Sequence, residues 1–116
     1  MGTIIHIELT STAPEKTADF YARAFGWEST ASPHVPDYLL TRTGDGPGID
    51  AAVMSSRYQA QNTILWIDVP DIDAAIAAVE AAGGSSAGDV LDLPGEGRVG
   101  YVEDPDGVVL GLKQSS

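Results

Sequence analysis

Hydrophobic and polar residues alternate along residues 4–9, IIHIEL, with the period of two that a β-strand requires. One face of the strand predicted over residues 3–10 is wholly apolar. The other face carries an imidazole and a carboxylate, from His6 and Glu8, two residues apart. The pattern therefore predicts a strand that buries one face under a helix and presents two chemically capable side chains on the other.

The period changes to that of a helix immediately afterwards. Thr12 and Glu15 have the spacing of a capping box, and Pro14 fits a first turn, where its missing N–H is harmless. Gly26 is placed to end the helix in the left-handed conformation. We therefore predict a helix that begins after Thr12, ends at Gly26 and buries an apolar stripe at helical spacing. The stripe consists of Thr17, Phe20, Tyr21, Ala24 and Phe25.

Three short strands are predicted next, over residues 27–31, 38–43 and 49–55, and loops rich in Pro, Gly and Asp separate them. The pattern then restarts, because TILWIDV at residues 63–69 matches TIIHIEL at residues 3–9. This similarity indicates an internal repeat.

The second half repeats the order of the first. Asp71 is expected to cap a helix that ends at Gly83 and Gly84. Its apolar stripe consists of Ile72, Ile76 and Val79. Three further strands are predicted over residues 85–91, 98–103 and 108–113. The sequence DPDG between the last two predicts a tight turn.

The predicted element order is βαβββ followed by βαβββ, which makes the fold class α+β. We expect a single domain over residues 1–116, built from two tandem modules, residues 1–58 and 59–116. Each helix should cover the outer face of its mixed, curved sheet, and the opposite faces should form a cup. A hydrated cavity there avoids the cost of burying unpaired carboxylates. The side chains expected near its wall are His6, Glu8, Trp66, Asp68 and Tyr101.

Composition narrows the possible partners. The chain has 116 residues, a net charge of −11, 43% hydrophobic residues and no cysteine. Six scattered basic residues form no patch that would follow a phosphate backbone, so nucleic acid is not an expected partner. No apolar run is long enough to span a bilayer, and disulfide and thiolate chemistry are excluded. We expect a cytosolic (cytoplasmic) protein with a small-molecule ligand.

Three segments resemble the vicinal oxygen chelate superfamily, which includes glyoxalase I, extradiol dioxygenases, fosfomycin-resistance enzymes and bleomycin-binding (bleomycin resistance) proteins. HIELTSTAPEKTADFYARAFGW resembles the start of its first module, WIDVPDIDAAIAAVEAAGG the start of its second, and GRVGYVEDPDGVVLGL its final hairpin. The resemblance covers nearly the whole chain and implies the duplicated βαβββ fold. It also implies a homodimer, because family members of this size often pair.

The resemblance implies a divalent metal held by His, Glu or Gln from the first and last strands of each module. His6 matches the first of these positions. The other three fall on Ile64, Gly111 and Val53, which offer no ligand atom. Since a divalent metal generally needs three side-chain ligands, no metal cofactor is expected.

A shifted ligand set stays open as a lower-probability alternative. His6 and Glu8 share a face, and Asp68 and Glu103 are further carboxylates that a metal would accept. The same carboxylates also suit the rim of a cavity.

Each candidate site residue has a functional and a structural interpretation. His6 and Glu8 are candidates for acid–base catalysis or ligand binding, or they only line a cavity wall. Trp66 and Tyr101 are candidates to stack on a ligand ring, or they fill space. Asp68 is a candidate to bind a cationic group, or it is solvated.

Two functions from different classes remain at this stage. One is a glyoxalase/bleomycin-resistance-like protein that binds a small organic molecule in its cup without a metal. The other is a metal-dependent lyase, isomerase or dioxygenase of the vicinal oxygen chelate type. The missing ligands and the charge of −11 favour the first, and whether the protein is an enzyme stays open.

Overall fold

The structure, a computed structural model, describes residues 2–115 as two compact units. We call residues 6–63 the N-terminal unit, and residues 2–5 together with 64–115 the C-terminal unit. Strand β1 (Ile4–Ser11) begins in the C-terminal unit and continues into the N-terminal one. Each unit holds one helix and a mixed sheet, so the fold class is α+β, as predicted.

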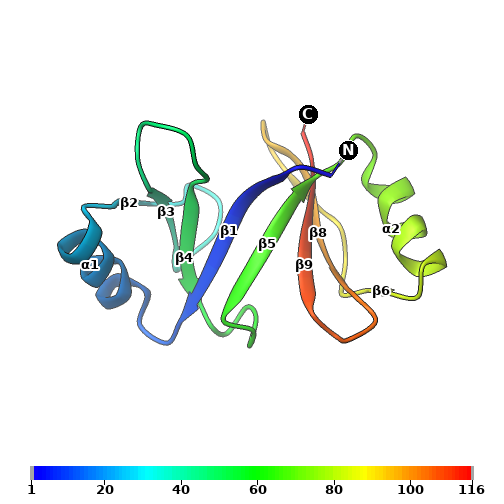
Figure 1. Ribbon diagram of the computed structural model, residues 1–116, viewed down its shortest axis with the longest axis horizontal. Coiled ribbons are helices and arrows are strands. Elements are labelled where there is room, and N and C mark those ends of the chain that lie inside the picture. Colours follow the sequence, from blue (N-terminus) through cyan, green and yellow to red (C-terminus); the bar gives the residue numbers. More distant parts are fainter. Residues whose placement is uncertain (1, 116) are drawn as a thin grey trace. The chain divides into compact units, whose positions relative to one another are not determined.

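The N-terminal unit follows the predicted βαβββ order (Figure 1). After β1 come α1 (Pro14–Phe25), β2 (Glu28–Ala31), β3 (Tyr38–Arg42) and β4 (Ala51–Ser55). The strand order is β2-β3-β4-β1, with β1 parallel to β4 and the other pairs antiparallel. Helix α1 contacts β2, β3 and β4.

Strand register fixes which side chains of this unit share a face. Glu8 lies opposite Ala52, and Leu9 lies opposite Val53. On the other side of β4, Tyr38 lies opposite Met54. Because paired residues point to the same face and alternate along each strand, Tyr38 shares the face of Glu8. Val53 lies on the opposite face.

The capping box predicted at Thr12 is wrong. The N-cap residue is Ala13, which makes no side-chain capping bond. The Ser11 hydroxyl instead accepts a hydrogen bond from the Ala13 N–H at 2.9 Å and pairs with the Thr17 hydroxyl at 2.7 Å. Gly26 ends the helix at φ 76°, as predicted, and donates to the Ala22 carbonyl.

The predicted apolar stripe of α1 is wrong for its two phenylalanines. Phe20 and Phe25 are 54% and 62% exposed, whereas the small Ala18 is buried. The exposed rings contact one another and those of Tyr21 and Trp27, with a shortest centroid distance of 4.9 Å between Tyr21 and Trp27. We call these four residues the α1 aromatic cluster.

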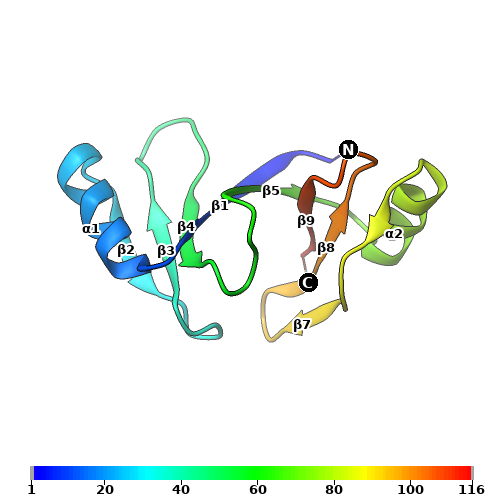
Figure 2. The ribbon, with the colours of Figure 1, turned by 90° about the horizontal axis from the view of Figure 1, so that it is seen from below.

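The C-terminal unit contains β5 (Thr63–Asp68) from Ile64 onward, α2 (Ile72–Ala81), β6 (Ser85–Ser86), β7 (Leu91–Leu93), β8 (Gly97–Glu103) and β9 (Val109–Gln114) (Figure 2). Strand β5 is parallel to β9, and β8 is antiparallel to it. The single strand predicted over residues 85–91 is wrong. Two short strands, β6 and β7, each pair with a different part of β8.

Helix α2 packs on this sheet as predicted. Asp71 caps it by accepting a hydrogen bond from the Ala74 N–H at 3.1 Å. The buried core comprises Val69, Ile72, Val102 and Leu112, with Ile67, Ala75, Ile76, Val79, Val90 and Leu110 packed around it. The DPDG turn also forms, closed by a 2.9 Å bond from the Gly107 N–H to the Asp104 carbonyl. Neither helix of residues 2–115 is long and apolar enough to cross a lipid bilayer.

Candidate functional site

A hydrogen-bonded cluster of three polar side chains lies in the N-terminal unit. The Glu8 carboxylate is only 2% exposed and accepts a hydrogen bond from the Tyr38 hydroxyl at 2.6 Å. The same Tyr38 oxygen lies 3.0 Å from His6 Nε2. We call this set the His6–Tyr38–Glu8 cluster. It brings the two sequence-predicted candidates together through a residue that the sequence analysis did not single out.

The sheet positions these side chains across three strands. His6 and Glu8 alternate onto one face of β1, and Tyr38 reaches them from β3 across the intervening strand β4. Ala52 lies opposite Glu8 in β4, and its small side chain leaves room for the phenol to cross. The length of tyrosine and the smallness of alanine together allow the contact.

The backbone just before Tyr38 is held in an unusual conformation. Asp37 has φ 53°, the one positive φ at a non-glycine among the described residues. Its carboxylate accepts a 2.5 Å hydrogen bond from Arg57 Nη1, and its carbonyl accepts the Ser55 N–H at 2.9 Å. The pKa of Arg57 is raised above its ordinary value, first by the Asp37 hydrogen bond and then by that to Tyr58. These bonds fix the turn that aims Tyr38 at Glu8.

Two aromatic candidates meet in the C-terminal unit. Trp66 is 7% exposed, and its ring centroid lies 5.1 Å from that of Tyr101. Both residues pair with Gly111 in the sheet, one from each side. A Cβ atom added at Gly111 would lie 2.2 Å from the Trp66 indole, well inside van der Waals contact. The indole therefore fills the space that a side chain at position 111 would need.

Asp68 follows Trp66 by two residues on β5 and lines a separate hollow. It is exposed at the end of β5, where its N–H donates to the Thr3 carbonyl at 2.8 Å. It lines an open hollow of about 410 Å³ with Gly2, Thr3, Val69, Pro70 and Ser115. This setting suits a solvated carboxylate that a cationic group can approach.

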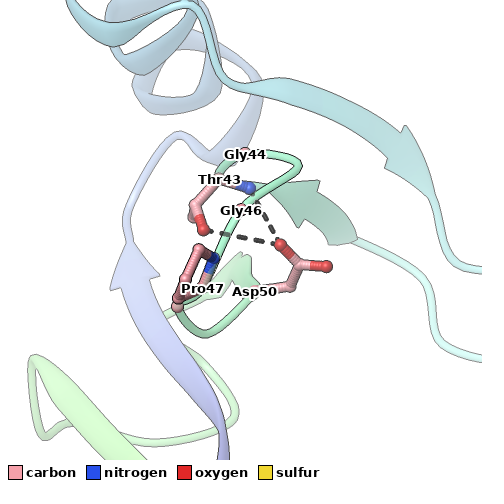
Figure 3. Close-up of a pocket in the computed structure, with 6 residues that line it drawn as sticks. Thr43, Gly44, Gly46, Pro47 and Asp50 are labelled. Atoms are coloured by element: carbon pink, nitrogen blue, oxygen red, sulfur yellow. Dashed lines mark hydrogen bonds between the residues drawn. The ribbon is translucent and has the colours of Figure 1, made fainter.

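A second hollow, of about 120 Å³, lies in the glycine-rich loop between β3 and β4 (Figure 3). Asp50 accepts a hydrogen bond there from the Thr43 N–H at 3.0 Å, and the Thr43 hydroxyl donates to the Ile49 carbonyl at 2.8 Å, with Asp50 farther away at 3.4 Å. Because Asp50 places a carboxylate at this loop, the loop does not suit a phosphate group. We interpret these bonds as holding the loop in shape.

The residues at the expected metal positions do not fit a metal ion. Ile64 is fully buried and apolar, and Gly111 is covered by Trp66. The equivalence predicted for Val53 is wrong, because Val53 pairs with Leu9 and so lies on the face opposite His6. The residue beside Glu8 is Ala52, which also has no ligand atom. His6 is the one member of this set with a donor atom.

The shifted ligand set has no support either. Among residues 2–115, no group of three or more His, Cys, Asp or Glu side chains comes together closely enough to hold a metal ion. Glu8 is engaged by Tyr38, and Asp68 lies at its own hollow.

Comparison with known proteins identifies the class to which this fold belongs. A family model described as the Glyoxalase/Bleomycin resistance protein/Dioxygenase superfamily matches residues 3–112. The chain therefore belongs to this superfamily, as the sequence resemblance implies.

Several relatives place the chain within that class. It is 27% identical over 122 residues to "Putative glyoxylase CFP32" of Mycobacterium bovis and Mycobacterium tuberculosis, covering 99% of this chain and 46% of the relative. The chain thus spans about half the length of those proteins. It is 32% identical over 99 residues to a glyoxylase-like domain-containing protein of Didymella fabae, covering 79% of this chain and 77% of that one.

A solved structure supports the fold. The methylmalonyl-CoA epimerase of Mycobacterium tuberculosis superimposes with a TM-score of 0.74 at 14% identity, covering 97% of this chain and 87% of that one. At this identity the match shows the fold alone.

Replacing Tyr38 by phenylalanine tests the His6–Tyr38–Glu8 cluster. The Tyr38→Phe variant removes a hydrogen bond to a buried carboxylate, so we expect the free energy of unfolding to fall by about 1–3 kcal/mol. Tyr21→Phe, the same change in the exposed α1 aromatic cluster, serves as the control, with an expected change within about 0.5 kcal/mol. Urea unfolding measures both, and equal stability of the two variants would contradict the role of Tyr38.

Proposed function

We propose that this protein binds a small organic molecule without a metal ion. The observation that carries this proposal is the Trp66 indole lying directly on Gly111, where the family resemblance implies a metal ligand. An apolar ring cannot coordinate a divalent cation, and it prevents a carboxylate at position 111 from entering the same space. The half-buried Tyr101 ring beside this indole instead offers apolar surface to an organic ligand.

We propose His6, Glu8, Trp66, Asp68 and Tyr101 as the candidate ligand-binding residues, together with Tyr38, because it is hydrogen-bonded to His6 and Glu8. Their roles differ. Glu8 is buried and bonded to Tyr38, so we assign it to holding Tyr38 rather than to direct contact with a cation. Asp68 is exposed and suits a cationic group. Tyr101 is half-buried and offers a ring for stacking, with the buried Trp66 packed beside it, and His6 offers hydrogen bonding.

A metal-dependent lyase, isomerase or dioxygenase is the alternative function. The matched relatives bear glyoxylase names, and the superimposed structure is an epimerase. The His6–Tyr38–Glu8 cluster also has the kinds of groups that acid–base catalysis uses. The residues at the metal positions nevertheless favour binding over this chemistry.

Metal content separates these two functions. Protein purified without a chelator should contain far less than one equivalent of nickel, zinc, manganese or iron, because His6 alone cannot hold such an ion. Mass spectrometry of the digested protein measures this, with His6→Ala and His34→Ala as matched variants. About one ion per chain, retained in His34→Ala and lost in His6→Ala, would overturn the metal-free proposal.

We also propose that the protein forms a homodimer through the α1 aromatic cluster. Exposed rings this large, from Phe20 and Phe25, are typical of a protein–protein interface. Strand β2 ends the sheet order of the same unit and offers an edge for pairing. A second copy suits this surface, because it presents the same exposed rings and the same strand edge, as a two-fold symmetric interface requires.

Sedimentation tests the dimer. The wild-type protein should sediment at twice its chain mass of 12.1 kDa, and the double change Phe20→Ser with Phe25→Ser should produce a monomer. Leu91→Ser is the control, because Leu91 is 58% exposed on β7 and outside the cluster. A wild-type monomer, or a dimer that survives the double change, would contradict the proposal.

A further inference from the structure

We infer that Tyr38 is a positioning residue that fixes His6 in the tautomer with its proton on Nε2. A phenol has one proton and directs it to one acceptor. The Tyr38 hydroxyl donates to Glu8 Oε2 at 2.6 Å. Its oxygen must therefore act as the acceptor toward His6, whose Nε2 lies 3.0 Å away. Nε2 consequently carries the hydrogen.

The burial of Glu8 sets the direction of this chain of hydrogen bonds. An ionised carboxylate only accepts, and at 2% exposure it needs donors from the protein. The 2.6 Å distance is typical of a hydroxyl bonded to a charged oxygen. If Tyr38 donated to His6 instead, the Tyr38 oxygen and an ionised Glu8 carboxylate would face each other with lone pairs at that short distance. The order His6 Nε2–H, Tyr38 O–H, Glu8 carboxylate avoids this repulsion.

The backbone before Tyr38 is built to hold this geometry. Asp37 adopts a left-handed conformation that a non-glycine residue keeps only where its surroundings hold it. Arg57 bonds its carboxylate, and Ser55 bonds its carbonyl. The Tyr58 hydroxyl donates to the Pro36 carbonyl at 2.6 Å and secures the same turn. Strain maintained by several bonds beside one side chain is typical of a functional position.

The fixed tautomer has a chemical consequence. With the proton on Nε2, the acceptor lone pair of the neutral ring lies on Nδ1. Tyr38 thus determines which nitrogen of His6 accepts and which donates. A role for the Nδ1 lone pair of His6 in ligand binding rests on the proposed function. The position of the proton on Nε2 does not rest on it.

Nitrogen-15 NMR of the imidazole rings tests the inference without ligand or metal. The chain has two histidines, so His34→Ala assigns the two sets of signals. In mildly alkaline solution, where an ordinary imidazole is neutral, wild-type His6 should be the Nε2–H form with a proton resonance protected from exchange. In Tyr38→Phe this protection should be lost and the Nδ1–H form should become populated, while His34 is unchanged.

The Glu8→Gln variant separates the effect of the Tyr38 hydrogen bond from the effect of the carboxylate charge at position 8. The amide oxygen of glutamine still accepts from Tyr38, so this variant should keep His6 as the Nε2–H form. An Nδ1–H form in the wild type would overturn the inference. So would an unchanged His6 in Tyr38→Phe, or a His6 that responds to Glu8→Gln but not to Tyr38→Phe. Because no ligand is present, none of these results depends on whether the protein binds one.

Discussion

The contact between the Trp66 indole and Gly111 is the constraint on which the functional account depends. Strands β5 and β9 pair these two residues directly. The indole lies so close to Gly111 that even one added carbon at position 111 would overlap it. Only glycine allows this packing without displacing the ring. The family resemblance implies a metal ligand at position 111, and in this chain the Trp66 indole occupies the space that such a side chain would need.

The His6–Tyr38–Glu8 cluster depends on the burial of the Glu8 carboxyl group. Glu8 is almost inaccessible to water, and a carboxylate in that position is tolerated only when protein groups satisfy it. Tyr38 does so and at the same time engages His6. The strained turn at Asp37 and its bond to Arg57 place the phenol. His6 therefore belongs to an ordered network even though the other residues at the metal positions do not coordinate.

Local signals in the sequence predicted most of the fold. The Asp71 cap, the Gly26 terminus and the DPDG turn all formed, because each depends on residues within one turn of chain. Features that depend on distant residues were missed. The face of the sheet on which Val53 lies is set by its pairing with Leu9, more than forty positions earlier in the chain. Tyr38 is likewise 30 residues from Glu8, to which it is hydrogen-bonded. The periodicity of α1 also did not predict which side of the helix the sheet would cover.

The most direct test of the central claim is thermal unfolding of the protein with organic probes, in the presence and absence of a chelator. The probes are methylmalonyl-CoA, an aldehyde–thiol adduct and a panel of cationic aromatic compounds. A true ligand at 100 times its dissociation constant should stabilise the fold by about 2.7 kcal/mol. The account predicts that at least one probe raises the melting temperature equally with and without chelator, and that Trp66→Ala weakens the shift. Stabilisation by these probes only when a divalent metal is added would contradict it.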